Sequence, residues 1–126
     1  MGHTILIADD HEDSRELLHL MLRGAGYSVR EAKNGIECLQ LARADTPDLI
    51  VMDLSMPVLD GWGLFEELKK DQTTRGIPCI VVTAQADLDR HRALEKGFIA
   101  YVSKPFATDD LLSTVAAALS HDTAAR

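Results

Sequence analysis

Five short apolar runs, each followed by a segment with helical periodicity, constrain the fold of this chain more than any other feature of its sequence. Each run has the length and the β-branched residues typical of a strand. The segments between the runs repeat apolar residues three and four positions apart, as helices that cover a sheet do. The predicted strands are 5–8, 27–32, 49–52, 79–82 and 98–102, and the predicted helices contain 17–22, 36–42, 64–68, 88–96 and 111–119.

Strict alternation of strand and helix predicts an α/β fold in which helices cover both faces of one parallel sheet. Right-handed crossovers then favour an open, doubly wound sheet of five strands. In the second run, apolar Tyr27 and Val29 alternate with Ser28 and Arg30, so this strand is expected to lie half exposed at an edge, whereas the first, third and fourth strands are expected to be buried. The predicted strand order is 2-1-3-4-5.

Glycines and short polar residues mark the predicted helix ends. Gly26 and Gly97 follow the first and fourth helices and are expected to end them. Asp87 and Thr108 precede the fourth and fifth helices and are expected to cap them.

The length of 126 residues suits one domain, and 46% hydrophobic with 26% charged residues is ordinary globular usage. We expect a single domain over residues 1–126, with its core at about 4–120, a short tail at 122–126 and no output domain. A net charge of −7 without a basic run argues against direct nucleic-acid binding. The apolar runs are too short for membrane insertion and the N-terminus has no targeting pattern, so a cytoplasmic protein is expected.

Polar residues stand where the predicted strands end. Asp9 and Asp10 follow the first strand, Asp53 the third, Thr83 the fourth and Lys104 the fifth. The carboxyl ends of parallel strands meet at one edge of the sheet, where ligands bind in open α/β folds. Each residue alone has a structural explanation, such as a helix cap or a turn. Together they predict a site.

Three carboxylates at one edge repel one another by roughly 4 kcal/mol per pair at 4 Å and an effective dielectric near 20. Lys104 supplies one positive charge, and Mg²⁺ is the hard cation expected to supply the rest. Beside these cations, the Asp53 carboxylate can act as a nucleophile that forms an acyl phosphate. Lys104 and the Thr83 hydroxyl would then stabilise the phosphoryl oxygens.

At these residues the chain resembles the receiver domain of response regulators, the CheY-like family, in its stand-alone single-domain type. The resemblance covers residues 4–120 and implies a flavodoxin-like (βα)5 fold. It rests on four motifs in order: ILIADD at 5–10, DLSMPVLDG at 53–61, VTA at 82–84 and YVSKPF at 101–106.

The resemblance implies that Asp53 accepts a phosphoryl group from a phosphohistidine of a sensor histidine kinase or a histidine phosphotransfer protein. It also implies that Asp10, Asp53 and the backbone carbonyl of Ser55 bind Mg²⁺, with Asp9 contributing through water. The bond between Lys104 and Pro105 is expected to be cis.

In such domains Thr83 and Tyr101 act as a switch that reshapes the face of the fourth helix, fifth strand and fifth helix. The signal is expected to leave by contact with a downstream protein effector or by phosphorelay. Tyr101 can equally be a core aromatic residue at a strand edge. Ser55 and Gln85 occupy positions that tune the lifetime of the acyl phosphate. The protein is expected to catalyse only its own phosphoryl transfer and dephosphorylation, so it is not classed as an enzyme.

Three other functions were weighed. A phosphoaspartate hydrolase would carry a second aspartate at position 55, where this chain has Ser55, and a flavin or nucleotide binder would carry a glycine-rich or hydroxyl-rich loop after the first strand, where this chain is acidic. A receiver-like docking module that is not phosphorylated is the remaining alternative. His11 is interpreted as a loop residue without a metal role, and Trp62 is expected to pack at the rim of the site.

Overall fold

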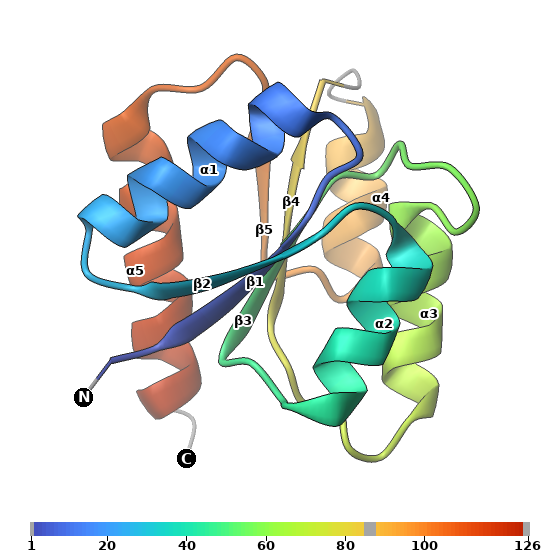
Figure 1. Ribbon diagram of the computed structural model, residues 1–126. Helices are drawn as coiled ribbons and strands as arrows, with labels where there is room; N and C mark the ends of the chain where they lie inside the picture. Colours follow the sequence, from blue (N-terminus) through green and yellow to red (C-terminus); the bar gives the residue numbers. More distant parts are fainter. Residues whose placement is uncertain (1, 85–87, 125–126) are drawn as a thin grey trace.

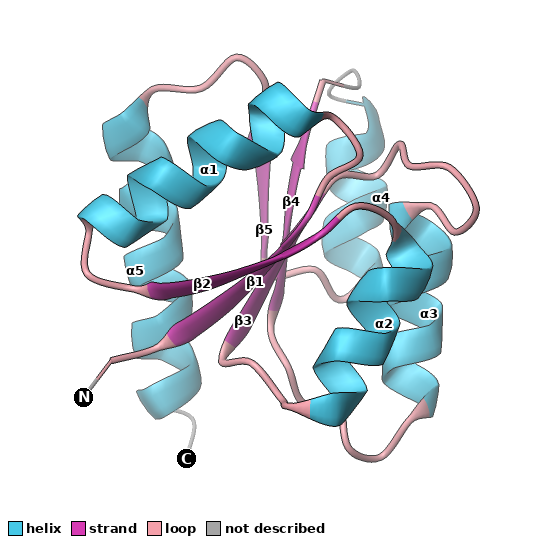
Figure 2. Ribbon diagram, viewed as in Figure 1, coloured by secondary structure: helices cyan, strands magenta, loops and turns pink. Residues whose placement is uncertain are grey.

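The computed structural model describes residues 2–84 and 88–124, and in these residues five strands alternate with five helices (Figures 1 and 2). The predicted α/β class is therefore confirmed. Gln85 and Asp87 lie outside the described residues. The elements in chain order are β1 (Thr4–Ala8), α1 (Glu12–Gly24), β2 (Ser28–Ala32), α2 (Gly35–Ala44), β3 (Leu49–Met52), α3 (Gly61–Lys70), β4 (Cys79–Thr83), α4 (Leu88–Lys96), β5 (Ala100–Ser103) and α5 (Thr108–Ala124).

The sheet is parallel throughout, with the strand order β2-β1-β3-β4-β5 that the sequence predicts. The half-polar β2 lies at one edge, while β3 and β4 are buried along their whole length. The helices α1 and α5 cover one face of the sheet, and α2, α3 and α4 cover the other (Figure 1). The order of the strands reverses between β1 and β3, which is where an open sheet of this kind forms a crevice at its carboxyl end.

Successive residues of each central strand point into two separate hydrophobic layers. Ile5 and Ile7 join the layer under α1 and α5, whereas Leu6 and Ala8 join the layer under α2, α3 and α4. Burial of each such large aliphatic side chain is worth about 1.5–3 kcal/mol. The two layers hold the strands rigidly, so the loops at the strand ends start from fixed positions.

Three glycines shape the turns around the sheet, two by their backbone conformation and one by a close backbone contact. Gly26 and Gly97 have φ angles of 98° and 119°, so both predicted helix-ending glycines adopt the left-handed conformation that favours glycine. A Cβ atom on Gly61 would lie 2.7 Å from the backbone oxygen of Asp53. The first turn of α3 therefore packs directly against the end of β3, which positions the loop that follows Asp53.

Cys38 and Cys79 are free and buried in the core. Burial raises the pKa of the Cys79 thiol to about 12 and also raises that of Cys38, so both thiols are unreactive near neutral pH. Within residues 2–84 and 88–124, no helix combines the length and the apolar character needed to cross a membrane.

The structure corrects three predicted boundaries. The fifth strand begins at Ala100, because the predicted strand residue Phe98 instead stacks on Phe65, with 4.1 Å between ring centroids. Thr108 is the first residue of α5 and not the cap before it. The same helix continues to Ala124, through part of the expected tail at 122–126. The apolar periodicity stops at Leu119, but the following residues include no glycine or proline to end the helix.

Candidate functional site

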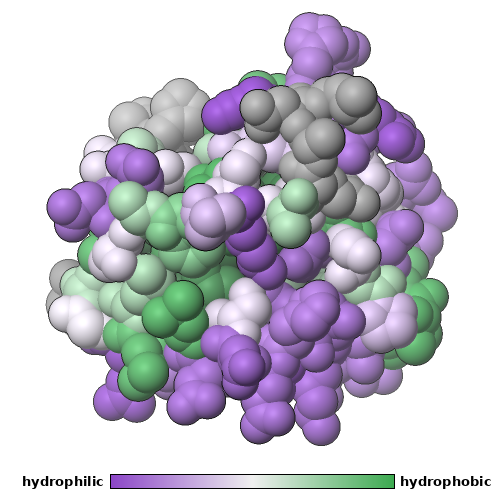
Figure 3. All heavy atoms as spheres, turned by 90° about the horizontal axis from the view of Figure 1, so that it is seen from above, coloured by the Kyte–Doolittle hydropathy of each residue, from purple (hydrophilic) through white to green (hydrophobic). Residues whose placement is uncertain are grey.

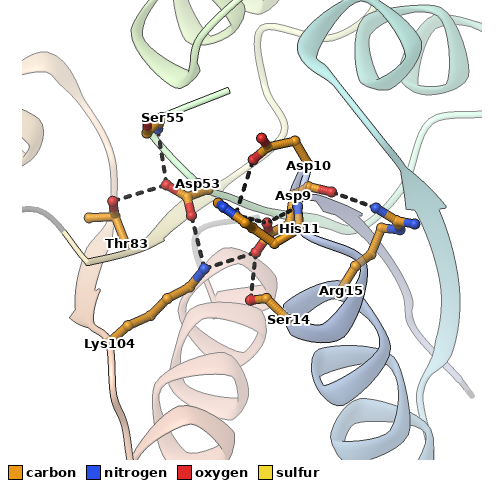
Figure 4. A network of polar contacts seen from close by, with 9 residues as sticks. All are labelled: Asp9, Asp10, His11, Ser14, Arg15, Asp53, Ser55, Thr83 and Lys104. Atoms are coloured by element: carbon orange, nitrogen blue, oxygen red, sulfur yellow. Dashed lines mark hydrogen bonds and ion pairs between the residues drawn. The ribbon is translucent and has the colours of Figure 1, made fainter. Parts of the chain in front are cut away.

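The polar residues at the carboxyl end of the sheet surround a hollow of about 460 Å³. Seen from this end of the molecule, hydrophilic residues cover the lower part of the surface, and hydrophobic residues gather on the left, where α1 and α5 lie in Figure 1 (Figure 3). Figure 4 shows the side chains of the site pointing toward one another from separate strands. The residues that line the hollow are His11, Ser14, Asp53, Ser55, Thr83, Ala84 and Lys104.

Asp53 directly follows β3 and is only 5% exposed. Its Oδ1 accepts hydrogen bonds from the backbone N–H of Ser55 and from the Thr83 hydroxyl, both at 3.0 Å. Its Oδ2 accepts a hydrogen bond from the Lys104 ammonium at 2.9 Å. Three donors from three different segments therefore fix the orientation of this carboxylate (Figure 4).

Asp9 directly follows β1 and is 1% exposed. Its carboxylate accepts hydrogen bonds from the Ser14 hydroxyl at 2.7 Å, from the backbone N–H of His11 at 2.9 Å and from Lys104 at 2.9 Å. Burial by itself raises the pKa of Asp9, but these hydrogen bonds and the positive charge of Lys104 outweigh burial and hold the pKa below its usual value. Asp9 is therefore a stable, ionised partner of Lys104.

Lys104 joins the two buried carboxylates with a single ammonium group. Burial lowers the pKa of Lys104, but the hydrogen bonds and negative charges of Asp53 and Asp9 raise it by more than burial lowers it. The pKa therefore lies above its ordinary value. The backbone N–H of Lys104 donates to the Thr83 carbonyl at 2.8 Å, which ties the end of β5 to the end of β4. The peptide bond to Pro105 is cis, as the sequence resemblance implies.

Asp10 differs from Asp9 and Asp53 in its hydrogen bonding. Its side chain is 28% exposed, but its Oδ1 is buried and accepts no hydrogen bond from any described residue. A buried acceptor without a partner costs about 1–3 kcal/mol. The atom lies 3.3 Å from Nδ1 of His11, which also contacts Asp9 (Figure 4). A carboxylate oxygen without a hydrogen bond is a suitable ligand for a cation.

His11 is a loop residue, as interpreted from the sequence, and it lies inside the acidic cluster. Its Nδ1 is 3.4 Å from Oδ1 of Asp9 and 3.3 Å from Oδ1 of Asp10. One ligand atom each from Asp9, His11 and Asp53 lies within 4.8 Å of the others, a group that can hold a metal ion. The sequence feature that marks this place is a histidine directly after two aspartates at a strand end.

Arg15 is a second residue that sequence reasoning missed. Its Nη1 donates to the backbone carbonyl of Asp9 at 2.9 Å, and its Nε donates to Glu31 on β2 at 3.0 Å. The guanidinium therefore braces the end of β1 against β2. An arginine in the first turns of a polar helix resembles a solvated charge, so the sequence carried no signal for this contact.

The two expected switch residues both point inward. The Thr83 side chain is 1% exposed and bonded to Asp53, and Tyr101 is 5% exposed within the hydrophobic layer under α2, α3 and α4. The Arg90 guanidinium lies 5.6 Å from the centre of the Tyr101 ring. Tyr101 is therefore a core aromatic residue in this structure, and its movement stays a prediction.

Trp62 packs between helices instead of lining the hollow. Its ring meets Phe98 edge to face at 6.0 Å between centroids, and the Arg92 guanidinium of α4 lies 4.3 Å from the centre of its ring. Trp62 belongs to the contact between α3 and α4, and it is absent from the residues around the hollow. The expected rim position of Trp62 is corrected accordingly.

Comparison with known proteins gives one family. The sequence profile of the "Response regulator receiver domain" matches residues 5–116. Over 116 residues the chain is 36% identical to the polar-differentiation response regulator DivK of Brucella anthropi, a match that covers 91% of this chain and 94% of DivK. It is 39% identical to the probable transcriptional regulator ycf27 of Guillardia theta, covering 91% of this chain but 44% of that regulator, so it spans less than half the length of this relative.

A solved structure resembles the fold. The receiver domain of a sensor histidine kinase from Pseudomonas aeruginosa superimposes with a TM-score of 0.87 at 31% identity, over 95% of this chain and 99% of that one. That structure holds a magnesium ion coordinated in its active site cleft.

Proposed function

Because the chain belongs to the response regulator receiver domain family, we propose that it is a two-component response regulator whose phosphoacceptor is Asp53. The observation that carries this proposal is the setting of the Asp53 carboxylate. It is 5% exposed and yet borders the hollow, with Thr83 on one oxygen and Lys104 on the other. A buried ionisable group held by specific partners in a cleft is a strong candidate for a reactive group.

Mg²⁺ is the proposed cofactor, held by Asp10, Asp53 and the backbone carbonyl of Ser55, with Asp9 contributing through water. Support comes from the buried Oδ1 of Asp10, which accepts no hydrogen bond within the described residues. The magnesium ion in the receiver from Pseudomonas aeruginosa supports the same choice. When bound, the ion supplies positive charge that offsets the carboxylates and the phosphoryl oxygens.

The side chains of the site divide the work of phosphoryl transfer. A carboxylate oxygen of Asp53 attacks the phosphorus of a phosphohistidine, the new P–O bond forms, the P–N bond breaks and the donor imidazole leaves. The Lys104 ammonium stabilises the negative charge on the phosphoryl oxygens, and the Thr83 hydroxyl donates a hydrogen bond to one of them. Attack by water on the same phosphorus later releases inorganic phosphate and restores the Asp53 carboxylate.

The proposed donor is a sensor histidine kinase or a histidine phosphotransfer protein in the cytoplasm, and the proposed output is protein contact or phosphorelay. The output face is the one formed by α4, β5 and α5. A hollow of about 530 Å³ lies there, with Arg90, Tyr101 and Phe106 among its lining residues. The chain modifies itself and is not a turnover enzyme.

The mass of the intact protein after incubation with Mg²⁺ and acetyl phosphate tests this proposal. Wild type and Asp13→Asn, which changes an exposed acid of α1, should each gain one phosphoryl group. Asp53→Asn should gain none. If wild type gains no phosphoryl group and also fails to bind the phosphoryl mimic beryllofluoride, the proposal is wrong and a docking module that is not phosphorylated becomes the better explanation.

A further inference from the structure

His11 stands where a helix cap is expected but does not act as one. It occupies the N-cap position of α1 with extended backbone angles, φ −86° and ψ 117°, and its side chain makes no capping hydrogen bond. N-cap positions favour Ser, Thr, Asp and Asn because their side chains accept from the first helical N–H groups. His11 does not give α1 this capping stabilisation. We therefore ask what else its side chain contacts.

The backbone of His11 is held in place by the site itself. Its N–H donates to Oδ1 of Asp9 at 2.9 Å, so the main chain bends back over the carboxylate. The ring then lies between Asp9 and Asp10, with Nδ1 within 3.4 Å of an oxygen of each (Figure 4). Although 68% of the His11 side chain is exposed, its Nδ1 faces the carboxylate of Asp9.

A nitrogen donor changes which cations a carboxylate site prefers. Mg²⁺ takes oxygen ligands in a strict octahedron and keeps several waters, so an imidazole adds little to its binding. First-row transition metals bind imidazole well, with affinity rising from Mn²⁺ through Co²⁺ to Ni²⁺. The buried Oδ1 of Asp10 accepts no hydrogen bond from the described residues and lies 3.3 Å from Nδ1 of His11, so an oxygen and a nitrogen ligand are side by side.

We propose that His11 is a metal ligand that shifts the selectivity of the carboxylate site from Mg²⁺ toward first-row transition metals. The inference rests on the metal site of the proposed function and deepens it, because it names the residue that discriminates between cations. Transition metals would then compete with Mg²⁺ for this receiver more strongly than for a carboxylate-only site.

Calorimetric titration of tag-free protein with Mg²⁺ and, separately, with Ni²⁺ tests the inference. His11→Asn keeps a residue suited to the N-cap position and removes the imidazole. His91→Ala is the matched control, because His91 lies on α4 with 87% of its side chain exposed. In His11→Asn the Kd for Ni²⁺ should rise at least roughly tenfold, the lower range of effects found when partners of metal ligands are removed. The Kd for Mg²⁺ should stay close to that of wild type, and the control should match wild type for both ions.

Proton NMR of the Co²⁺-loaded protein gives a second readout. Wild type should show imidazole ring protons shifted by the paramagnetic ion, and His11→Asn should lack them. Equal changes in the Ni²⁺ and Mg²⁺ affinities, in either direction, would show that the ring acts as a general cation partner or competitor and would overturn the inference. Absence of Ni²⁺ binding by wild type would overturn it as well.

These outcomes are separate from a failure of the proposed function. Phosphorylation of wild type with Mg²⁺ decides whether Asp53 is the acceptor, and the ratio of the two dissociation constants decides the role of His11. A selectivity that depends on His11 without any phosphorylation would refute only the proposed function.

Discussion

The two ends of the sheet both carry aspartates, but they use them in opposite ways. At the amino end, Asp48 accepts from the Thr4 N–H at 2.8 Å, and Asp71 accepts from the backbone N–H and hydroxyl of Thr73 at 2.9 and 2.8 Å. Asp71 also accepts a hydrogen bond from Arg43 of α2 at 2.8 Å, so both of these carboxylates have nearby donors. At the carboxyl end, Asp9 and Asp53 come from different strands, are almost fully buried and share the one ammonium of Lys104.

This difference shows that negative charge is not fully balanced at the carboxyl end of the sheet. The amino-end carboxylates are each balanced by nearby donors, so they stabilise the loops that contain them. At the carboxyl end, three carboxylates face a single lysine, and one oxygen of Asp10 is buried without a hydrogen bond from any described residue. The site can therefore hold a further cation in addition to the Lys104 ammonium.

Among the variants that test this difference between the two ends, Lys104→Met should show the largest change in stability and in acyl phosphate formation. Loss of the ammonium leaves Asp9 and Asp53 facing each other without a cation, and one-sided breaking of a buried pair costs up to about 3–5 kcal/mol. Acyl phosphate formation should fall by about 10²–10³, as when one donor to a developing charge is removed. Timed mass spectra and urea unfolding measure the two effects.

Lys69→Met is the control for this variant, because the Lys69 ammonium donates to the Arg75 carbonyl near the amino end of the sheet. It should phosphorylate at the wild-type rate. If Lys104→Met does the same, Lys104 has no part in stabilising the phosphoryl group.

Mg²⁺ should stabilise the protein by about 1.4 kcal/mol at ten times its Kd, because it binds only the folded carboxylate cluster. Asp10→Asn should remove most of this increment, whereas the amino-end variant Asp48→Asn should keep it. Urea unfolding with and without Mg²⁺ measures the increment. A wild-type protein indifferent to Mg²⁺ would contradict the proposed metal site.

Backbone strain adds to the cost of the carboxyl end. Val58, in the loop between β3 and α3, has a φ of 70° and is 83% exposed. A left-handed conformation costs a β-branched residue about 1–2 kcal/mol, and glycine avoids most of it while losing some entropy. Val58→Gly should therefore raise the free energy of unfolding by about 0.5–1 kcal/mol, with Val58→Asn intermediate. A lower urea midpoint for the glycine variant would contradict strain at this position.

The smallest expected effect is the difference between Asp9 and Asp71 in how the stability of the metal-free protein changes with acid pH. Asp9 and Asp71 both have lowered pKa values, although by different means: at Asp71 the hydrogen bonds from Thr73 dominate and Arg43 adds to them. A folded pKa below the unfolded value of about 3.9 means that the unfolded state binds protons more readily. The stability from each group is thus present above pH ~4 and is lost as the pH falls through its folded pKa.

Urea unfolding of Asp9→Asn and Asp71→Asn across this acid range compares the two ends directly. Asp9→Asn should lose more of the wild-type pH dependence, because Asp9 is buried and paired with Lys104, while the half-buried Asp71 is more open to screening by solvent. The reverse order would mean that the amino-end turn contributes more to acid sensitivity than the site.

The sequence by itself determined the α/β class, the strand order and which residues meet at the carboxyl end of the sheet. Periodicity and strand ends are local properties, and parallel strands bring their carboxyl ends together whatever the side-chain details. Asp9, Asp10, Asp53, Thr83 and Lys104 could therefore be placed at one edge from their positions alone.

Tertiary structure decided the rest, because it depends on side-chain directions and distances between distant segments. That Lys104 bridges Asp9 and Asp53, and that Thr83 and Tyr101 point inward, follows from contacts across 30 to 95 residues of chain or from packing under the helices. The direction of the His11 ring was also decided by the tertiary structure, although its position after Asp9 and Asp10 is visible in the sequence. A ring three residues past a strand can turn toward solvent or toward the carboxylates, and only the structure shows its Nδ1 beside Asp9 and Asp10.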